Sequence, residues 1–142
     1  MTNFTTRMMM AAATLVVAAG SASAQGLTAE IPFPFRAAGT VMAAGKYELR
    51  TTQNYGHPVY RIWNVTEHRA ILVLASGSET PAKAWVAAGK PVLTFECGTG
   101  RCSLSGIWDG SSLPASTFPR GHLGRDEAAR TEIVVMHKAK GD

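Results

Sequence analysis

Short runs of residues in which apolar and polar side chains alternate constrain the fold of this chain more than any other feature. Successive side chains of a β-strand point to opposite faces, so strict alternation is typical of a strand with one buried face. Alternation is clearest at residues 31–35 and 46–50, and further runs rich in β-branched and aromatic residues lie at 59–64, 90–97, 102–108 and 132–137. Glycine, proline, asparagine and serine separate them, and no strong amphipathic helical pattern lies between residues 25 and 124. This spacing predicts an antiparallel all-β domain.

The alternation also predicts which face of each run is buried. The expected inward-facing side chains are Ile31, Phe33, Phe35, Tyr47 and Leu49. Tyr60 and Ile62 share one face of their run, opposite Arg61 and Trp63, and the last run places Val134 and Met136 opposite Ile133 and Val135. Pro32 and Pro34 cannot donate backbone hydrogen bonds, which predicts an edge strand or an entry segment for the first run. Residues 70–75 are apolar on both faces, which predicts a central strand that is covered on both sides.

Polar and glycine-rich segments between the runs predict turns and loops. These segments lie at residues 54–58, 67–69, 76–84, 109–112 and 116–124. Residues 126–130 are expected to form one short helix near the C-terminus, because acidic residues at its start suit the helix dipole. About seven or eight strands in one domain predict either a small antiparallel barrel-like meander or a two-sheet sandwich. Short connections favour the meander, but the sequence leaves both open.

The first 24 residues have the pattern of a cleaved signal peptide. Arg7 is positively charged, residues 8–19 are apolar, and small residues precede the expected cleavage between Ala24 and Gln25. The apolar run is shorter than the ~20 residues that a membrane-spanning helix needs, and no cysteine for a lipid anchor follows the cleavage point. Cleavage leaves 142 − 24 = 118 residues, 25–142, which suit one domain. We therefore expect a single β-domain, periplasmic or secreted, with no membrane span after signal removal.

Cys97 and Cys102 are the only cysteines, and four residues separate them. Outside the cytoplasm, two cysteines this close are expected to be oxidised. In an antiparallel hairpin they would lie opposite each other, so that the residue numbers of partners add up to 97 + 102 = 199. The expected cross-strand pairs are then Phe95–Leu104 on the face of the disulfide and Glu96–Ser103 on the other face. The wide spacing and the lack of nearby histidines favour a structural disulfide over redox catalysis or zinc binding.

Other residues that could carry chemistry are scattered along the chain. The four histidines form no metal-binding motif; they are His57, His68, His122 and His137. Glu96 and Asp109 are candidates for a glycosidase-type carboxylate pair, but solvent-facing strand positions explain them more simply. No G-x-S-x-G nucleophile elbow is present. We therefore predict no catalytic, cofactor-binding or metal-binding residues.

Two further patterns have both a functional and a structural interpretation. Residues 64–66, which begin with Asn64, match the glycosylation sequon, a short pattern that also occurs by chance and means little in a bacterial host. The large aromatic residues Trp63, Trp85 and Trp108 would suit the lining of a barrel that holds an apolar ligand. Filling the core of a small domain is the simpler interpretation of all three.

The charge of the mature chain limits its partners. Arg7 is the one charged residue of the leader, so 13 basic and 10 acidic residues remain and the net charge is 13 − 10 = +3. The basic residues are scattered and form no stripe interleaved with aromatic residues, which argues against nucleic-acid binding. A weak attraction to an anionic envelope polymer remains open through net charge alone.

The N-terminal pattern resembles a group of small exported bacterial proteins. The matching residues are Ala29–Phe35, Gly39 and Ala44–Tyr47, which fit an I-P-F-x-F opening after a signal peptide and a later A-G-x-Y. The hairpin segments 93–95 and 104–108 are also similar to theirs, whereas Met42 and Ala43 stand where Leu-Pro is usual. Most members have no assigned function, so the resemblance implies an exported β-domain and no catalytic residues.

Export, β-pattern and the lack of catalytic motifs together favour a non-enzymatic, envelope-associated structural or binding module. That function predicts an interior filled by side chains. A carrier of a small apolar ligand is the alternative, and it requires an enclosed cavity of several hundred Å³ lined by tryptophan and tyrosine. A hydrolytic enzyme is third, and it requires histidine and carboxylate side chains that converge in a cleft.

Overall fold

The computed structural model describes residues 26–54, 57–111, 114–119 and 130–139. The expected leader, with its cleavage point between Ala24 and Gln25, lies outside these residues, as do His122 and the segment 126–129 of the expected helix. Arg130, the last residue of that expected helix, begins a strand instead.

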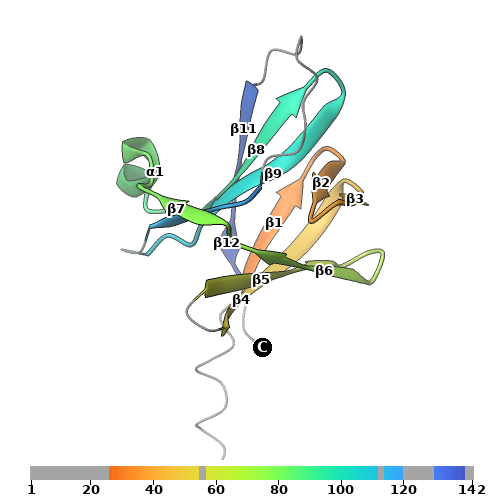
Figure 1. Cartoon of the computed structure of the whole chain (residues 1–142), viewed down its shortest axis with the longest axis horizontal. Coiled ribbons are helices and arrows are strands. Elements are labelled where there is room, and N and C mark those ends of the chain that lie inside the picture. The colour runs from red at the N-terminus through yellow and green to blue at the C-terminus, as the bar shows by residue number, and fades with distance from the viewer. Residues whose placement is uncertain (1–25, 55–56, 112–113, 120–129, 140–142) are drawn as a thin grey trace, which may run out of the picture.

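Two sheets form the described part of the chain (Figure 1). The first sheet has the order β12-β1-β4-β5-β6, with β1 (Leu27–Ile31), β4 (Gly45–Asn54), β5 (His57–Asn64), β6 (Arg69–Leu74) and β12 (His137–Lys138). The second has the order β11-β8-β9-β10-β7, with β2 beside β9 and β3 beside β2. Its strands are β2 (Phe35–Ala37), β3 (Thr40–Met42), β7 (Gly77–Glu79), β8 (Val92–Gly98), β9 (Arg101–Trp108), β10 (Ala115–Thr117) and β11 (Arg130–Val135).

The predicted all-β class is confirmed, and the two sheets decide between the alternatives in favour of the sandwich. Over the described residues the sheets remain separate layers and do not close into a barrel. Several strands have only two or three residues, which is why the number of strands exceeds the expected seven or eight. Neighbouring strands are antiparallel except for a single parallel bridge between Arg36 of β2 and Ser103 of β9.

One continuous apolar core lies between the inner faces of the two sheets. The predicted inward residues Ile31, Phe35, Tyr47 and Leu49 are buried, and Phe33 packs against them at the margin. Tyr60 and Ile62 lie on one face of β5 as expected, and that face is the buried one. Phe35 contacts Tyr47 and Phe95 edge to face, at centroid distances of 5.3 Å each. The expected first run is not one strand, because β1 ends at Ile31 and β2 begins at Phe35.

The C-terminal segment joins the two sheets. β11 pairs with β8 of the second sheet, and β12 pairs with β1 of the first. Between them, the buried Met136 donates its backbone N–H to the carbonyl of Pro91 at 2.8 Å. Val134 and Met136 are buried and Ile133 and Val135 exposed, so the predicted faces of this run are confirmed.

The prediction for residues 70–75 is wrong. β6 is the outer strand of the first sheet and pairs only with β5 among the described strands. Val73 is buried, but Leu72 and Leu74 are 64% and 57% exposed. Apolar side chains on both faces therefore do not place this strand inside the molecule.

The helix of the described residues is α1 (Lys83–Ala88). The prediction of a polar loop over residues 76–84 is only partly right, because that segment contains β7 and its last two residues begin α1. The helix begins shortly after Pro81 and ends at Gly89, whose φ of 65° is in the left-handed region that favours glycine. The Gly89 N–H donates to the carbonyls of Trp85 and Val86, which terminates the helix. In Figure 1, α1 lies outside both sheets.

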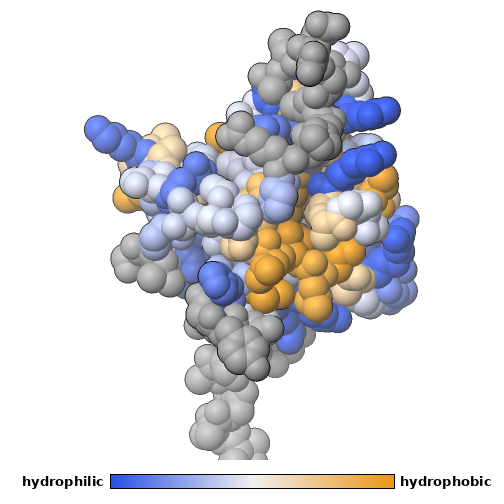
Figure 2. Space-filling model, viewed as in Figure 1, coloured by the Kyte–Doolittle hydropathy of each residue, from blue (hydrophilic) through white to orange (hydrophobic). Residues whose placement is uncertain are grey.

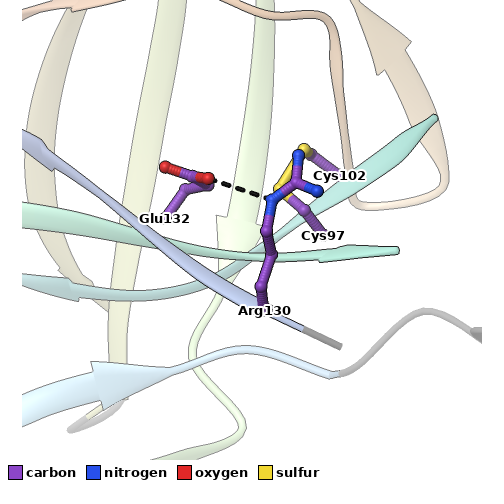
Figure 3. Close-up of a disulfide and its surroundings, with 4 residues drawn as sticks. All are labelled: Cys97, Cys102, Arg130 and Glu132. Atoms are coloured by element: carbon purple, nitrogen blue, oxygen red, sulfur yellow. Dashed lines mark hydrogen bonds and ion pairs between the residues drawn. A yellow bond between two sulfur atoms is a disulfide. The ribbon is translucent and has the colours of Figure 1, made fainter. Parts of the chain in front are cut away.

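The predicted hairpin and disulfide are confirmed. Cys97 of β8 and Cys102 of β9 are bonded and lie opposite each other (Figure 3), and the pairs Phe95–Leu104 and Glu96–Ser103 follow as expected. Beyond Phe95 the register shifts, and Thr94 pairs with Gly106. Arg130 of β11 pairs with Cys97 in the ladder, and its guanidinium Nε donates to Glu132 Oε1 at 3.0 Å beside the disulfide.

Candidate functional site: a polar pocket at the end of the sandwich

A pocket of about 500 Å³ lies where the chain passes from the first sheet to the second. Strands β4 and β5 form one wall and strands β7 and β10 the other. The lining residues are Thr51, His57, Pro58, Tyr60, Ala75, Ser76, Gly77, Ser78, Asp109, Pro114 and Ser116. Six of the eleven carry a side-chain hydroxyl, carboxylate or imidazole, and a seventh, Tyr60, has a phenol, so polar groups and apolar surface both line the pocket.

Two consecutive residues of the β6–β7 connection hold the two walls together. Ala75 donates its N–H to the carbonyl of Pro58 in β5 at 3.3 Å. Ser76 donates its N–H to the carbonyl of Thr117 in β10 at 2.8 Å, and its hydroxyl donates to the same oxygen at 3.2 Å. The connection that the sequence indicated as a polar loop therefore positions one side of the pocket rigidly.

Tyr60 and Ser116 form the inner end of the pocket. Their hydroxyl oxygens are 2.7 Å apart, and the two residues are 7% and 6% exposed. The Tyr60 ring contacts Phe118 edge to face at 5.6 Å, which fixes the phenol against the core. Burial raises the pKa of Tyr60 and the Asp109 carboxylate raises it further, against the lowering effect of the Ser116 hydrogen bond. The phenol is therefore neutral at physiological pH and can both donate and accept hydrogen bonds.

Asp109 and His57 lie at the exposed part of the lining. Asp109 follows β9, and its Oδ1 accepts hydrogen bonds from the backbone N–H of Ser111 at 2.9 Å and from the Ser111 hydroxyl at 2.5 Å. This turn holds the carboxylate in place beside the pocket. His57 is the first residue of β5 and is exposed.

The structure separates the other predicted candidates. His68 packs against Trp63 at a centroid distance of 5.7 Å, and His137 is in β12. Glu96 pairs with Ser103 near the turn of the β8–β9 hairpin, whereas Asp109 follows the opposite end of that hairpin. These two carboxylates therefore do not form a pair. Throughout the described ranges, no three histidine, cysteine or carboxylate side chains are grouped as metal ligands would be.

The three tryptophans have separate surroundings, and none is among the residues lining the pocket. Trp63 is on the outer face of β5, where the guanidinium of Arg61 lies 5.3 Å from its ring centroid. Trp108 is buried in a small second cluster with Val92 and Ala115, and Trp85 of α1 packs against it.

Asn64, the first residue of the sequon, is 1% exposed and has a structural role. Its Oδ1 accepts from the backbone N–H groups of Thr66 and Glu67, each at 2.9 Å, and its Nδ2 donates to the Tyr47 hydroxyl at 2.9 Å. Tyr47 in turn donates to the carbonyl of Ala43. The amide nitrogen that a glycan would modify is thus buried and hydrogen-bonded in the folded protein.

Sequence reasoning missed Tyr60 and Ser116 as a pair. The sequence placed Tyr60 on one strand face with the apolar Ile62, and a buried phenol needs a hydrogen-bond partner, which was the available signal. Ser116 lies in a segment expected to be irregular, so its place opposite Tyr60 depends on the pairing of β10 with β9.

Comparison of this chain with protein-family models, with curated proteins and with solved structures finds no match. Among the described residues no helix has both the length and the apolar character needed to cross a membrane.

Proposed function

We propose that this protein is an exported, non-enzymatic binding module that takes a small, uncharged, hydroxyl-rich ligand, such as a sugar unit of an envelope polymer, in the pocket at the end of the sandwich. The observation that carries the proposal is the buried Tyr60–Ser116 hydroxyl pair at the inner end of a pocket that seven polar side chains line together with apolar surface. The signal-peptide pattern, the resemblance to exported bacterial proteins and the disulfide support a periplasmic or secreted location.

The ligand class follows from the size and lining of the pocket. A volume of about 500 Å³ falls within the range of small-molecule sites. Hydroxyl groups such as those of Thr51, Ser76 and Ser78 both donate and accept hydrogen bonds, which matches the hydroxyls of a sugar. Pro58 and the Tyr60 ring add apolar surface for the carbon face of such a ligand. A purely apolar ligand would leave many of these polar groups without partners, which is unfavourable.

The arrangement of Ser116 favours binding over hydrolysis. A serine nucleophile needs an adjacent general base that removes its proton. The partner of the Ser116 hydroxyl is the Tyr60 phenol, which is neutral at physiological pH because a tyrosine ionises only near pH 10 and burial raises its pKa further. The Asp109 Oδ1 is engaged by Ser111, so the carboxylate is held in a turn and not against the serine.

Binding can be tested by NMR titration of the protein recovered from an exporting host with neutral oligosaccharides, with a fatty acid and with an ester substrate. Saccharides should shift the resonances of pocket residues, and Tyr60→Phe and Ser116→Ala should each weaken binding about tenfold, the effect of one good hydrogen bond. Tyr47→Phe is the matched control, because it removes a buried phenol that does not line the pocket.

Three outcomes would contradict the proposal. They are saccharide shifts confined to other surfaces, selective uptake of the fatty acid, and turnover of the ester that Ser116→Ala abolishes. The second would favour the apolar carrier and the third the hydrolase.

A further inference from the structure

β6 has an open edge and exposed apolar side chains that the pocket does not use. Figure 2 shows an apolar area over the region where Figure 1 places β6. On the outer face, Leu72 and Leu74 are 64% and 57% exposed and Ala70 is also exposed. A run of five uncharged residues, 70–74, at a sheet edge is a template for another strand, and proteins normally protect such edges.

The other outer strands of the described sheets are short or carry charges, whereas β6 has five consecutive uncharged residues. β12 has two residues, both polar, β3 has three residues, and β7 has three residues, one of them charged. β11 carries the Arg130–Glu132 ion pair. Residues 70–74 of β6 contain no charge and no proline, and their ladder with β5 has no bulge.

The alternation of backbone hydrogen bonds along β6 shows which residues direct their N–H and C=O groups to the unpaired side of the strand. Ala75 donates its N–H toward β5, to the carbonyl of Pro58. In an antiparallel ladder the backbone groups of alternate residues point to the same side, so Val73 and Ile71 also bond to β5. The N–H and C=O groups of Ala70, Leu72 and Leu74 therefore point away from the sheet, to the side on which none of the described strands pairs.

We propose that a second copy of this chain occupies this edge, with the two β6 strands antiparallel about a two-fold axis at Leu72. In this register, Leu72 pairs with its own copy and Ala70 pairs with Leu74 of the partner subunit. These three outward-facing residues of each chain pair only with one another, which forms about six hydrogen bonds. The two first sheets then become one continuous sheet.

The strand is complementary to itself in this register. On the outer face Leu72 meets Leu72 and Leu74 meets Ala70, so the exposed apolar side chains cover one another. On the inner face Ile71 meets Val73, which extends the two cores. A register centred on Ile71 would instead place Leu74 opposite His68, whose positive φ of 56° takes it out of the extended strand conformation.

Charge also permits this pairing. Arg69 faces the uncharged Ala75 of the partner, so no like charges lie directly opposite. Arg61 pairs with Leu72 within the sheet, so the two copies of Arg61 are three strand spacings apart, about 14 Å. That separation exceeds the Debye length at physiological salt, and their repulsion is therefore screened.

Analytical ultracentrifugation of the protein recovered from an exporting host, from about 1 µM to about 1 mM, tests the proposal. We expect a concentration-dependent dimer whose dissociation constant rises at least tenfold in Leu72→Lys, because two lysines would then meet at the axis. Ile133→Lys is the matched control: Ile133 is 49% exposed on β11, and the same charge there should leave the dimer unchanged.

Cross-linking provides a second readout. The described cysteines are both in the disulfide, so Leu72→Cys introduces a thiol that meets its own copy only in this register. Paired residues of an antiparallel ladder are about 5.5 Å apart between Cα atoms, within reach of a disulfide. Oxidation should give a covalent dimer for Leu72→Cys and not for Ile133→Cys. A monomer at all concentrations, a dimer that Leu72→Lys leaves intact, or equal cross-linking of the two variants would overturn the proposal.

Discussion

Replacement of Asn64 by alanine should destabilise the fold more than any other single polar substitution in the first sheet. The side chain is buried and makes three hydrogen bonds, two with the backbone N–H groups of Thr66 and Glu67 and one with the Tyr47 hydroxyl. It therefore joins the end of β5 to β4 and shapes the connection to β6.

The magnitude follows from these three bonds. A hydrogen bond within a protein stabilises it by about 1 kcal/mol net, so Asn64→Ala should lower the free energy of unfolding by about 3 kcal/mol. The two backbone donors are only partly buried and can be rehydrated, and Tyr47 retains the carbonyl of Ala43 as a partner. These compensations keep the loss from being larger. In a domain of this size, a loss of about 3 kcal/mol corresponds to a melting temperature lower by roughly 12 °C.

Urea denaturation followed by circular dichroism would measure the change. Thr66→Ala is the control, because it destroys the same sequon but retains the Thr66 N–H that Asn64 binds; it should change stability by less than about 0.5 kcal/mol. A loss below about 1 kcal/mol in Asn64→Ala would refute the structural role of the amide. Equal losses in the two variants would show that the sequon itself matters.

Three further predictions concern the disulfide, a turn and a phenol. Removing the disulfide by Cys97→Ala with Cys102→Ala should lower the free energy of unfolding by about 2 kcal/mol, the chain-entropy effect of so short a loop. Chemical reduction of the wild-type disulfide should lower it by the same amount in the same denaturation assay. Ala38 and Gly39 both have positive φ, 51° and 74°, in the two-residue β2–β3 turn; Ala38→Asn should raise stability by about 0.5 to 1 kcal/mol, whereas Gly39→Ala should lower it. Burial raises the pKa of Tyr60, so the native state retains a proton that the unfolded chain releases near pH 10. The free energy of unfolding should therefore be unaffected by this group below pH 10 and fall as the pH rises toward the native pKa. In denaturation experiments at alkaline pH, Tyr60→Phe should reduce this fall.

Much of the fold could be predicted because alternation determines which side of a strand is buried. The inward positions of Tyr47 and Leu49 and the shared face of Tyr60 and Ile62 followed from it, whereas the register between Cys97 and Phe95 followed from the spacing of the two cysteines. The register beyond Phe95 could not be predicted, since it depends on a bulge.

The bulge lies where three strands make close contacts that residue patterns do not reveal. The Thr94 and Ser105 hydroxyls are 3.0 Å apart across the two strands. Gly106 then lies so close to its neighbours that a Cβ atom there would be 2.8 Å from Thr94 Oγ1 and 3.1 Å from the carbonyl oxygen of Ser116. Such a contact between three strands depends on tertiary structure.

The location of β6 was predicted wrongly for a related reason. Two apolar faces indicate that a strand has partners, but the pattern does not say whether they belong to the same chain. The pocket was equally inaccessible to sequence reasoning, because Tyr60, Ser76 and Asp109 come from distant segments and meet only where the two sheets end.

The pairing of the two ends of the described chain affects how fast the protein folds. Leu27 pairs with Lys138 and Thr28 with His137, so the first sheet is complete only when the last strand has arrived. Contacts between residues so far apart in sequence are slow to form, since the entropy of closing a long loop opposes them. A chain synthesised N-terminus first would thus lack β12 until the residues that follow β11 had appeared, so this topology delays completion of the first sheet.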